Sequence, residues 1–179
     1  MTSMYYYGWF LAEPAAPHPM LTKWAVDVPL AFKNNCQFWQ PETLSTFETN
    51  MHALYMGCRV AFDPTLKPED VYADINTRFY GSAAKEMTAY WKFIDDVWIN
   101  TPEYSGCGFG YLRRWTPERM KEAKRLIGAA VVACKTDAET RRVYLALQSF
   151  DMFQWFMEMR ENQAAGRFDN LANSAAGWR

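Results

Sequence analysis

Two short segments of the chain combine aromatic side chains with groups that can bind hydroxyls. "GWFLAEP" contains Trp9 and Glu13, and "FWQPET" contains Trp39, Gln40 and Glu42. Aromatic faces stack on the apolar faces of sugar rings, while amides and carboxylates hydrogen-bond to hydroxyl groups, as in many small-molecule clefts. The alternative is that both indoles fill the interior of the fold and both carboxylates cap helices. Residue types alone leave both interpretations open.

Each of these segments belongs to the end of a predicted strand. Tyr5 to Leu11 and Cys36 to Gln40 are short and β-favouring, and proline-rich or polar residues follow them. A helix is expected from Met20 to Asn34, and another after a cap at Ser45 or Thr46. The order strand, helix, strand, helix favours parallel pairing, with functional loops at the carboxyl ends of the strands.

Two strands alone do not form a stable sheet of this kind. We therefore expect residues 1–62 to be the last βα units of a larger barrel-like domain, present here incompletely. Because the candidate binding residues follow the strands, they would lie at the carboxyl end of that barrel.

After residue 62 the pattern becomes purely helical, so we expect residues 63–179 to form a helical domain. Pro68 is suited to begin a helix that ends at Tyr80, before Gly81, and Ser82 is expected to cap a helix from Ala83 to Ile99. A loop is predicted over 101–110. The remaining expected helices begin after the Thr116 cap and at Asp137.

The helix beginning at Asp137 is predicted to run to about Asn162. It is apolar nearly all round, which predicts the central helix of a bundle. The expected fold class is therefore mainly α with a small α/β part.

Composition excludes several classes of function. The chain has 179 residues, half of them hydrophobic and 17% aromatic, which is enough for a large core. Its 19 basic and 20 acidic residues give a net charge of −1, so no overall field favours nucleic acid or an anionic membrane. No stretch has the length of a membrane span, and the start of the chain lacks the basic and aliphatic pattern of a signal peptide.

Metal and cofactor chemistry is not expected. The four cysteines are far apart without a CxxC pair, and the histidines are His18 and His52 alone. His52 and Glu48 are four residues apart and could bind a metal or relay a proton, but a histidine satisfied by neighbours is the simpler interpretation. "SGCGFG" lacks the strand and helix context of a phosphate loop.

One long segment resembles a known family. "NMHALYMGCRVAFDPTLKPEDVYADINTRFYGSAAKEMTAYW" is similar to a bacterial domain-of-unknown-function family of glycoside-hydrolase-like proteins, themselves similar to α-glucuronidases. The shared features are a helix beginning at Asn50, a hydrophobic–Asp–Pro step at 62–64, and an aromatic–Gly–x–Ala–Ala turn at 80–84. The resemblance is clearest over residues 45–130. Phe62 stands where the family usually has Trp.

This resemblance implies a (β/α)₈ barrel followed by an all-helical domain, and a parent protein that acts on a polysaccharide or glycan. It implies an extracytoplasmic location as well. The acid and base carboxylates of such barrels lie on earlier strands, so no catalytic residue is assigned and this portion alone is expected to be inactive. The alternative from the residues themselves is a non-catalytic helical module that forms homodimers, with the helix from Asp137 burying its extra apolar face against a partner subunit.

Overall fold

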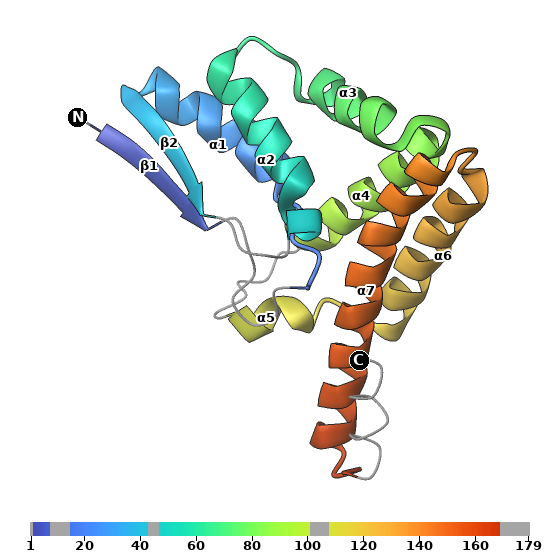
Figure 1. Cartoon of the computed structure of the whole chain (residues 1–179). Coiled ribbons are helices and arrows are strands. Elements are labelled where there is room, and N and C mark those ends of the chain that lie inside the picture. The colour runs from blue at the N-terminus through green and yellow to red at the C-terminus, as the bar shows by residue number, and fades with distance from the viewer. Residues whose placement is uncertain (1, 8–14, 43–46, 101–107, 169–179) are drawn as a thin grey trace.

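The protein is mainly helical, with a small two-stranded parallel sheet (Figure 1). The computed structural model describes residues 2–7, 15–42, 47–100 and 108–168. Its elements, in chain order, are β1 (Thr2–Tyr7), α1 (Leu21–Lys33), β2 (Cys36–Glu42), α2 (Phe47–Phe62), α3 (Pro68–Tyr80), a 3₁₀ turn (Gly81–Ala83), α4 (Ala84–Ile99), α5 (Gly108–Leu112), α6 (Pro117–Ala133) and α7 (Asp137–Ala164). The mainly α class is therefore confirmed.

The two strands and the first two helices form one layered unit. β1 and β2 pair in parallel through the crossover helix α1, and both α1 and α2 lie along one face of the sheet (Figure 1). Trp24 of α1 is fully buried and meets the ring of Trp39 edge to face at 5.0 Å. Gly57 of α2 supplies the space for both rings, since any larger residue there would project into them.

We predict that Gly57→Ala destabilises the fold by about 1–3 kcal/mol, the usual cost of overpacking a core. The new methyl group would overlap the Trp39 ring and lie 2.9 Å from Cε3 of Trp24. Gly128→Ala is the matched control, because it is also helical but has nothing within 4 Å of the added Cβ. Helix propensity should make that control about 1 kcal/mol more stable. Denaturant unfolding measures both, and equal shifts would contradict the packing of Trp39 on Gly57.

The helical part begins as its sequence predicts. Pro68 and Pro117 are the first residues of α3 and α6, and the Thr116 side chain accepts a hydrogen bond from the Arg119 amide at 3.4 Å. The buried face of α4, which includes Trp91, packs against α3 and α6. One continuous core extends from this region to α1 and α2, so the two parts share buried surface across the predicted boundary at residues 62 and 63.

Ser82 does not cap a helix directly, which corrects one prediction. Residues 81–83 form a 3₁₀ turn, and α4 begins at Ala84. The Ser82 amide and hydroxyl donate to the two carboxylate oxygens of Glu139, at 2.9 and 2.6 Å, and the hydroxyl also lies 3.0 Å from the Ala133 carbonyl. Ser82 therefore ties the start of α4 to the turn between α6 and α7.

Glu139 is the centre of this connection. It also completes a capping box with Thr136 at the start of α7. Hydrogen bonds from Ser82 are the main cause that lowers the pKa of Glu139 to about 2. Gly81 has a φ of 55°, and its missing Cβ makes room for the Glu139 carboxylate. The glycine, serine and glutamate therefore form one structural clamp.

Two further helix predictions were wrong. Residues 108–112 belong to α5, where a loop was expected to continue to Gly110. α7 is not surrounded on all sides: it buries one face, with Val143, Phe150 and Phe153 inside, while Leu145 is 51% exposed. A count of apolar residues does not reveal which of them face solvent, and α7 lies at the side of the core.

Candidate functional site

The face of the sheet that the described helices do not cover carries the polar groups of the candidate site. Tyr5 pairs with Gln40 in the parallel register, so their side chains lie on the same face. The Tyr5 hydroxyl donates to Glu42 Oε2 at 2.6 Å, which joins the strands through their side chains. Tyr5 and Phe38 are 52% and 43% exposed, and Gln40 is also exposed. This face therefore presents two aromatic rings beside an amide and a carboxylate.

The structure brings Gln40 and Glu42 together but separates them from Trp39. Successive residues of a strand point to opposite faces, and Trp39 points to the face covered by α1 and α2. Its ring packs on Trp24 and Gly57, where it fixes β2 to the helices. Trp9 and Glu13 lie outside the described residues. The strand period of two was the sequence signal that could have separated Trp39 from its neighbours.

The start of α1 is held by a carboxylate from α4. Its cap position is Met20, which has no side-chain acceptor. Asp95 takes that role: its Oδ1 accepts from the Leu21 amide at 3.1 Å, and its Oδ2 accepts from the Thr22 amide and hydroxyl. Asp95 is 7% exposed, and burial raises its pKa. Asp95 is therefore a buried cap for a helix that is distant in the sequence.

The segment that leads from β1 into α1 is also fixed by the helical part. Residues 15–20 are all buried. The Tyr111 hydroxyl of α5 donates to the Pro17 carbonyl at 2.6 Å, and the His18 ring meets Trp98 of α4 edge to face at 4.2 Å. α4 and α5 therefore hold this segment in place.

His52 is an interior histidine of α2. It is 1% exposed, and its ring is stacked on Tyr80 and lies 4.3 Å from Trp91. Its Nε2 donates to Asn76 Oδ1 at 3.1 Å, because the Asn76 amide nitrogen donates to the Tyr72 carbonyl. Burial lowers the pKa of His52 to about 3. This environment favours the structural interpretation of His52.

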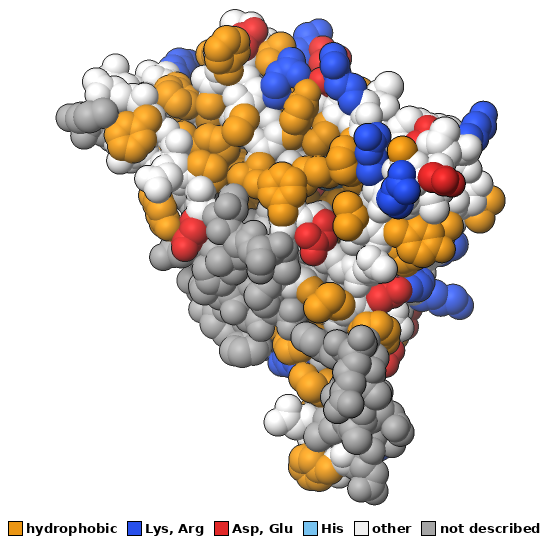
Figure 2. All heavy atoms as spheres, viewed as in Figure 1, with side chains coloured by type: hydrophobic (Ala, Val, Ile, Leu, Met, Phe, Trp, Pro, Cys, Tyr) orange, Lys and Arg blue, Asp and Glu red, His pale blue; other side chains and the backbone are white. Residues whose placement is uncertain are grey.

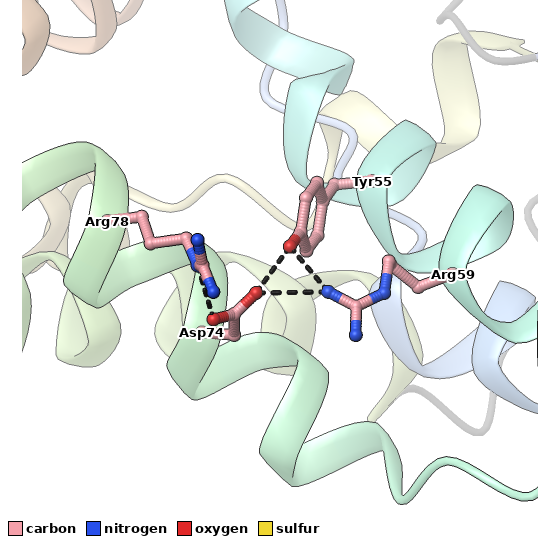
Figure 3. A network of polar contacts seen from close by, with 4 residues as sticks. All are labelled: Tyr55, Arg59, Asp74 and Arg78. Atoms are coloured by element: carbon pink, nitrogen blue, oxygen red, sulfur yellow. Dashed lines mark hydrogen bonds and ion pairs between the residues drawn. The ribbon is translucent and has the colours of Figure 1, made fainter.

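A polar network joins α2 to α3 (Figure 3). Asp74 accepts from the Tyr55 hydroxyl, from Arg59 Nη1 at 3.0 Å and from Arg78 Nε at 2.6 Å. The hydrogen bonds from Tyr55 and Arg78 hold the pKa of Asp74 below its usual value. Arg59 is three turns from the start of α2 and therefore far from the carboxyl ends of the strands. The network is a connection between helices, away from the candidate site.

Other classes of site have no support in the described residues. Within residues 2–7, 15–42, 47–100 and 108–168, no group of three His, Cys, Asp or Glu side chains is arranged to hold a metal ion. Cys36, Cys58 and Cys134 are free thiols. None of the helices in this part of the chain is long and apolar enough to cross a membrane.

Comparisons with known proteins found no match. No family model matches the chain, and neither a curated protein nor a solved structure is significantly similar to it.

Proposed function

We propose that this chain is the C-terminal portion of a glycoside-hydrolase-like protein, made of the last βα units of a (β/α)₈ barrel and a helical domain. Its exposed sheet face would line part of a carbohydrate-binding cleft. The observation that carries the proposal is the asymmetry of the sheet. One face of two parallel strands is covered by helices, and the other presents Tyr5, Gln40 and Glu42 near the carboxyl ends.

This asymmetry is what a barrel requires. In a (β/α)₈ barrel the helices cover the outside, the other face of each strand points inward, and the active site lies at the carboxyl ends of the strands. Parallel strands are normally buried on both faces. The half-exposed rings of Tyr5 and Phe38 are therefore consistent with a surface that further strands would enclose.

The outer surface of α2 supports the same proposal. Figure 2 shows hydrophobic side chains gathered over α2, whose two ends carry exposed phenylalanines. Phe47 is 51% exposed and Phe62 is 93% exposed. In a complete barrel each helix packs against its neighbours on both sides, and such a surface would meet the next unit.

The polar residues of the exposed sheet face are expected to bind the carbohydrate and not to catalyse its hydrolysis. Hydrolysis of a glycosidic bond uses two carboxyl groups on either side of the scissile bond. On the sheet face, Glu42 is the only carboxylate among the described residues, and it already accepts a hydrogen bond from Tyr5. Gln40 and Glu42 can bind hydroxyls, while Trp9 and Glu13 remain candidate rim residues. The catalytic residues would belong to other strands.

A titration with oligosaccharides tests the proposal. We predict that mixed oligosaccharides perturb the amide resonances of β1 and β2 with millimolar affinity. Gln40→Ala, which removes a hydrogen-bonding group, and Glu42→Gln, which removes the charge of an acceptor, should each weaken this response about tenfold. Glu69→Gln, on α3, is the matched control and should leave it unchanged. Perturbations confined to other elements, or none at all, would contradict a carbohydrate cleft at this face.

A further inference from the structure

A groove between α6 and α7 has the features of an interface. Its volume is about 600 Å³. Trp115, Met120 and Met157 supply its apolar part, and long charged side chains form both sides. Methionine side chains adapt to the shape of a partner, and grooves between two helices commonly receive further helices.

The two sides of the groove carry opposite charges. The α6 side contributes Lys121, Lys124 and Arg125, and the α7 side contributes Glu158 and Glu161. Lys124 pairs with Asp151, and Arg125 pairs with Glu122 of its own helix.

Lys121 and Glu158 are exposed, and the ion pairs among the described residues do not join them to each other or to another charge. A basic side and an acidic side therefore remain available to a partner.

The alignment of α6 with α7 places the charges of Lys121 and Glu158 at nearly the same height along the helix axes. α6 and α7 run antiparallel, joined by the short turn 134–136, and the Lys124–Asp151 pair fixes their alignment. That alignment puts Lys121 level with Gln154, one turn from Glu158. Helical side chains lean toward the N-terminus of their own helix. In an antiparallel pair this brings the ammonium of Lys121 and the carboxylate of Glu158 to nearly the same height.

From this pattern we infer that the groove is the interface of a homodimer, with a two-fold axis parallel to α6 and α7. Such an axis places α6 of one copy opposite α7 of the other, so each basic side faces an acidic side at the same height. An axis perpendicular to the helices would instead oppose like charges. The parallel axis produces an antiparallel four-helix bundle, whose core receives Met120 and Met157 from both copies.

Charge reversal tests this geometry. Sedimentation over a concentration series should show a dimer for the wild type, weakening as salt is raised. Lys121→Glu or Glu158→Lys should each weaken dimerisation by at least about tenfold, because each creates two like-charge contacts across the axis. Both positions are exposed, so the variants should fold. Lys85→Glu, an exposed change of the same charge on α4, should leave the dimer intact.

Mixing distinguishes this arrangement from other interfaces. An equimolar mixture of the Lys121→Glu and Glu158→Lys variants should form a heterodimer, since every facing pair is then of opposite charge. The double variant should form a homodimer again. A wild-type monomer at every concentration, or a dimer indifferent to these reversals, would overturn the inference. The outcome is independent of the carbohydrate proposal, whose test uses the sheet face.

Discussion

Lowering the pH from 7.5 to 5 is expected to reduce the free energy of unfolding by about 4 kcal/mol, roughly 2 kcal/mol for each of two histidines. His18 and His52 are the only histidines in the chain, and both are deeply buried. Burial lowers the pKa of each from 6.5 to about 3. Below pH 6.5 the unfolded chain binds two protons that the folded chain excludes. The stabilisation is therefore complete above pH 6.5 and is lost as the pH falls toward 3.

One carboxylate acts in the opposite direction. Burial raises the pKa of Asp95, so the folded state binds this proton more readily and offsets part of the loss in acid. Glu139, with a pKa near 2, adds acid sensitivity only below about pH 4.5, where unfolded glutamate becomes protonated. Between pH 7.5 and 5 the histidines should therefore dominate.

His52→Gln separates the two histidines. Glutamine can still donate to Asn76 but does not titrate, so the difference in unfolding free energy between pH 7.5 and 5 should fall to about half. Urea unfolding at both pH values measures this difference, and the imidazole resonances of the wild type should not titrate above pH 5. A histidine that titrates near pH 6.5 in the folded protein would disprove its burial.

Local patterns predicted much of the helical part. Proline at the first position, the Thr116 cap and a 3.6-residue apolar period are local features, and they located α3 and α6 to within a few residues; Asp137 marked the start of α7. The capping box at Thr136 is similarly local. These signals need no knowledge of tertiary packing.

The positions that were missed depend on contacts between distant segments. Asp95 caps α1 from 74 residues away, and Ser82 bonds to Glu139 across 57 residues. A signal for the first contact was present, since Met20 precedes α1 where a capping side chain is usual. A helix start without a local cap predicts an acceptor from elsewhere, although the sequence does not say which one.

The candidate site shows the same division between local and tertiary information. The sequence segment "FWQPET" suggested that Trp39, Gln40 and Glu42 act together, yet the strand places the indole on the face opposite the two polar groups. Alternation along a strand is local and predicts this separation. Which of the two faces the helices cover is a tertiary property, decided by the fit of Trp39 into the space at Gly57.

Gly81→Ala is expected to be strongly destabilising because it acts on both backbone and packing. An alanine at a φ of 55° costs about 1–3 kcal/mol of backbone strain. Its Cβ would also overlap the carboxylate of Glu139 and lie 3.0 Å from Cδ, so the hydrogen bonds that Ser82 donates to Glu139 would have to break. Gly166→Ala is a control for positive φ without a packing effect, with a φ of 69° and nothing within 4 Å of the added Cβ.

A double-mutant cycle isolates the part of this effect that passes through Glu139. In a Glu139→Ala background the overlap is gone, so Gly81→Ala should cost only its own backbone strain. In the wild-type background Gly81→Ala should cost clearly more than in the Glu139→Ala background. Chemical denaturation of the four proteins of the cycle gives the coupling free energy between positions 81 and 139. An identical cost in both backgrounds would mean that the carboxylate does not occupy the space beside Gly81, and that the start of α4 is held to the α6–α7 turn by other contacts.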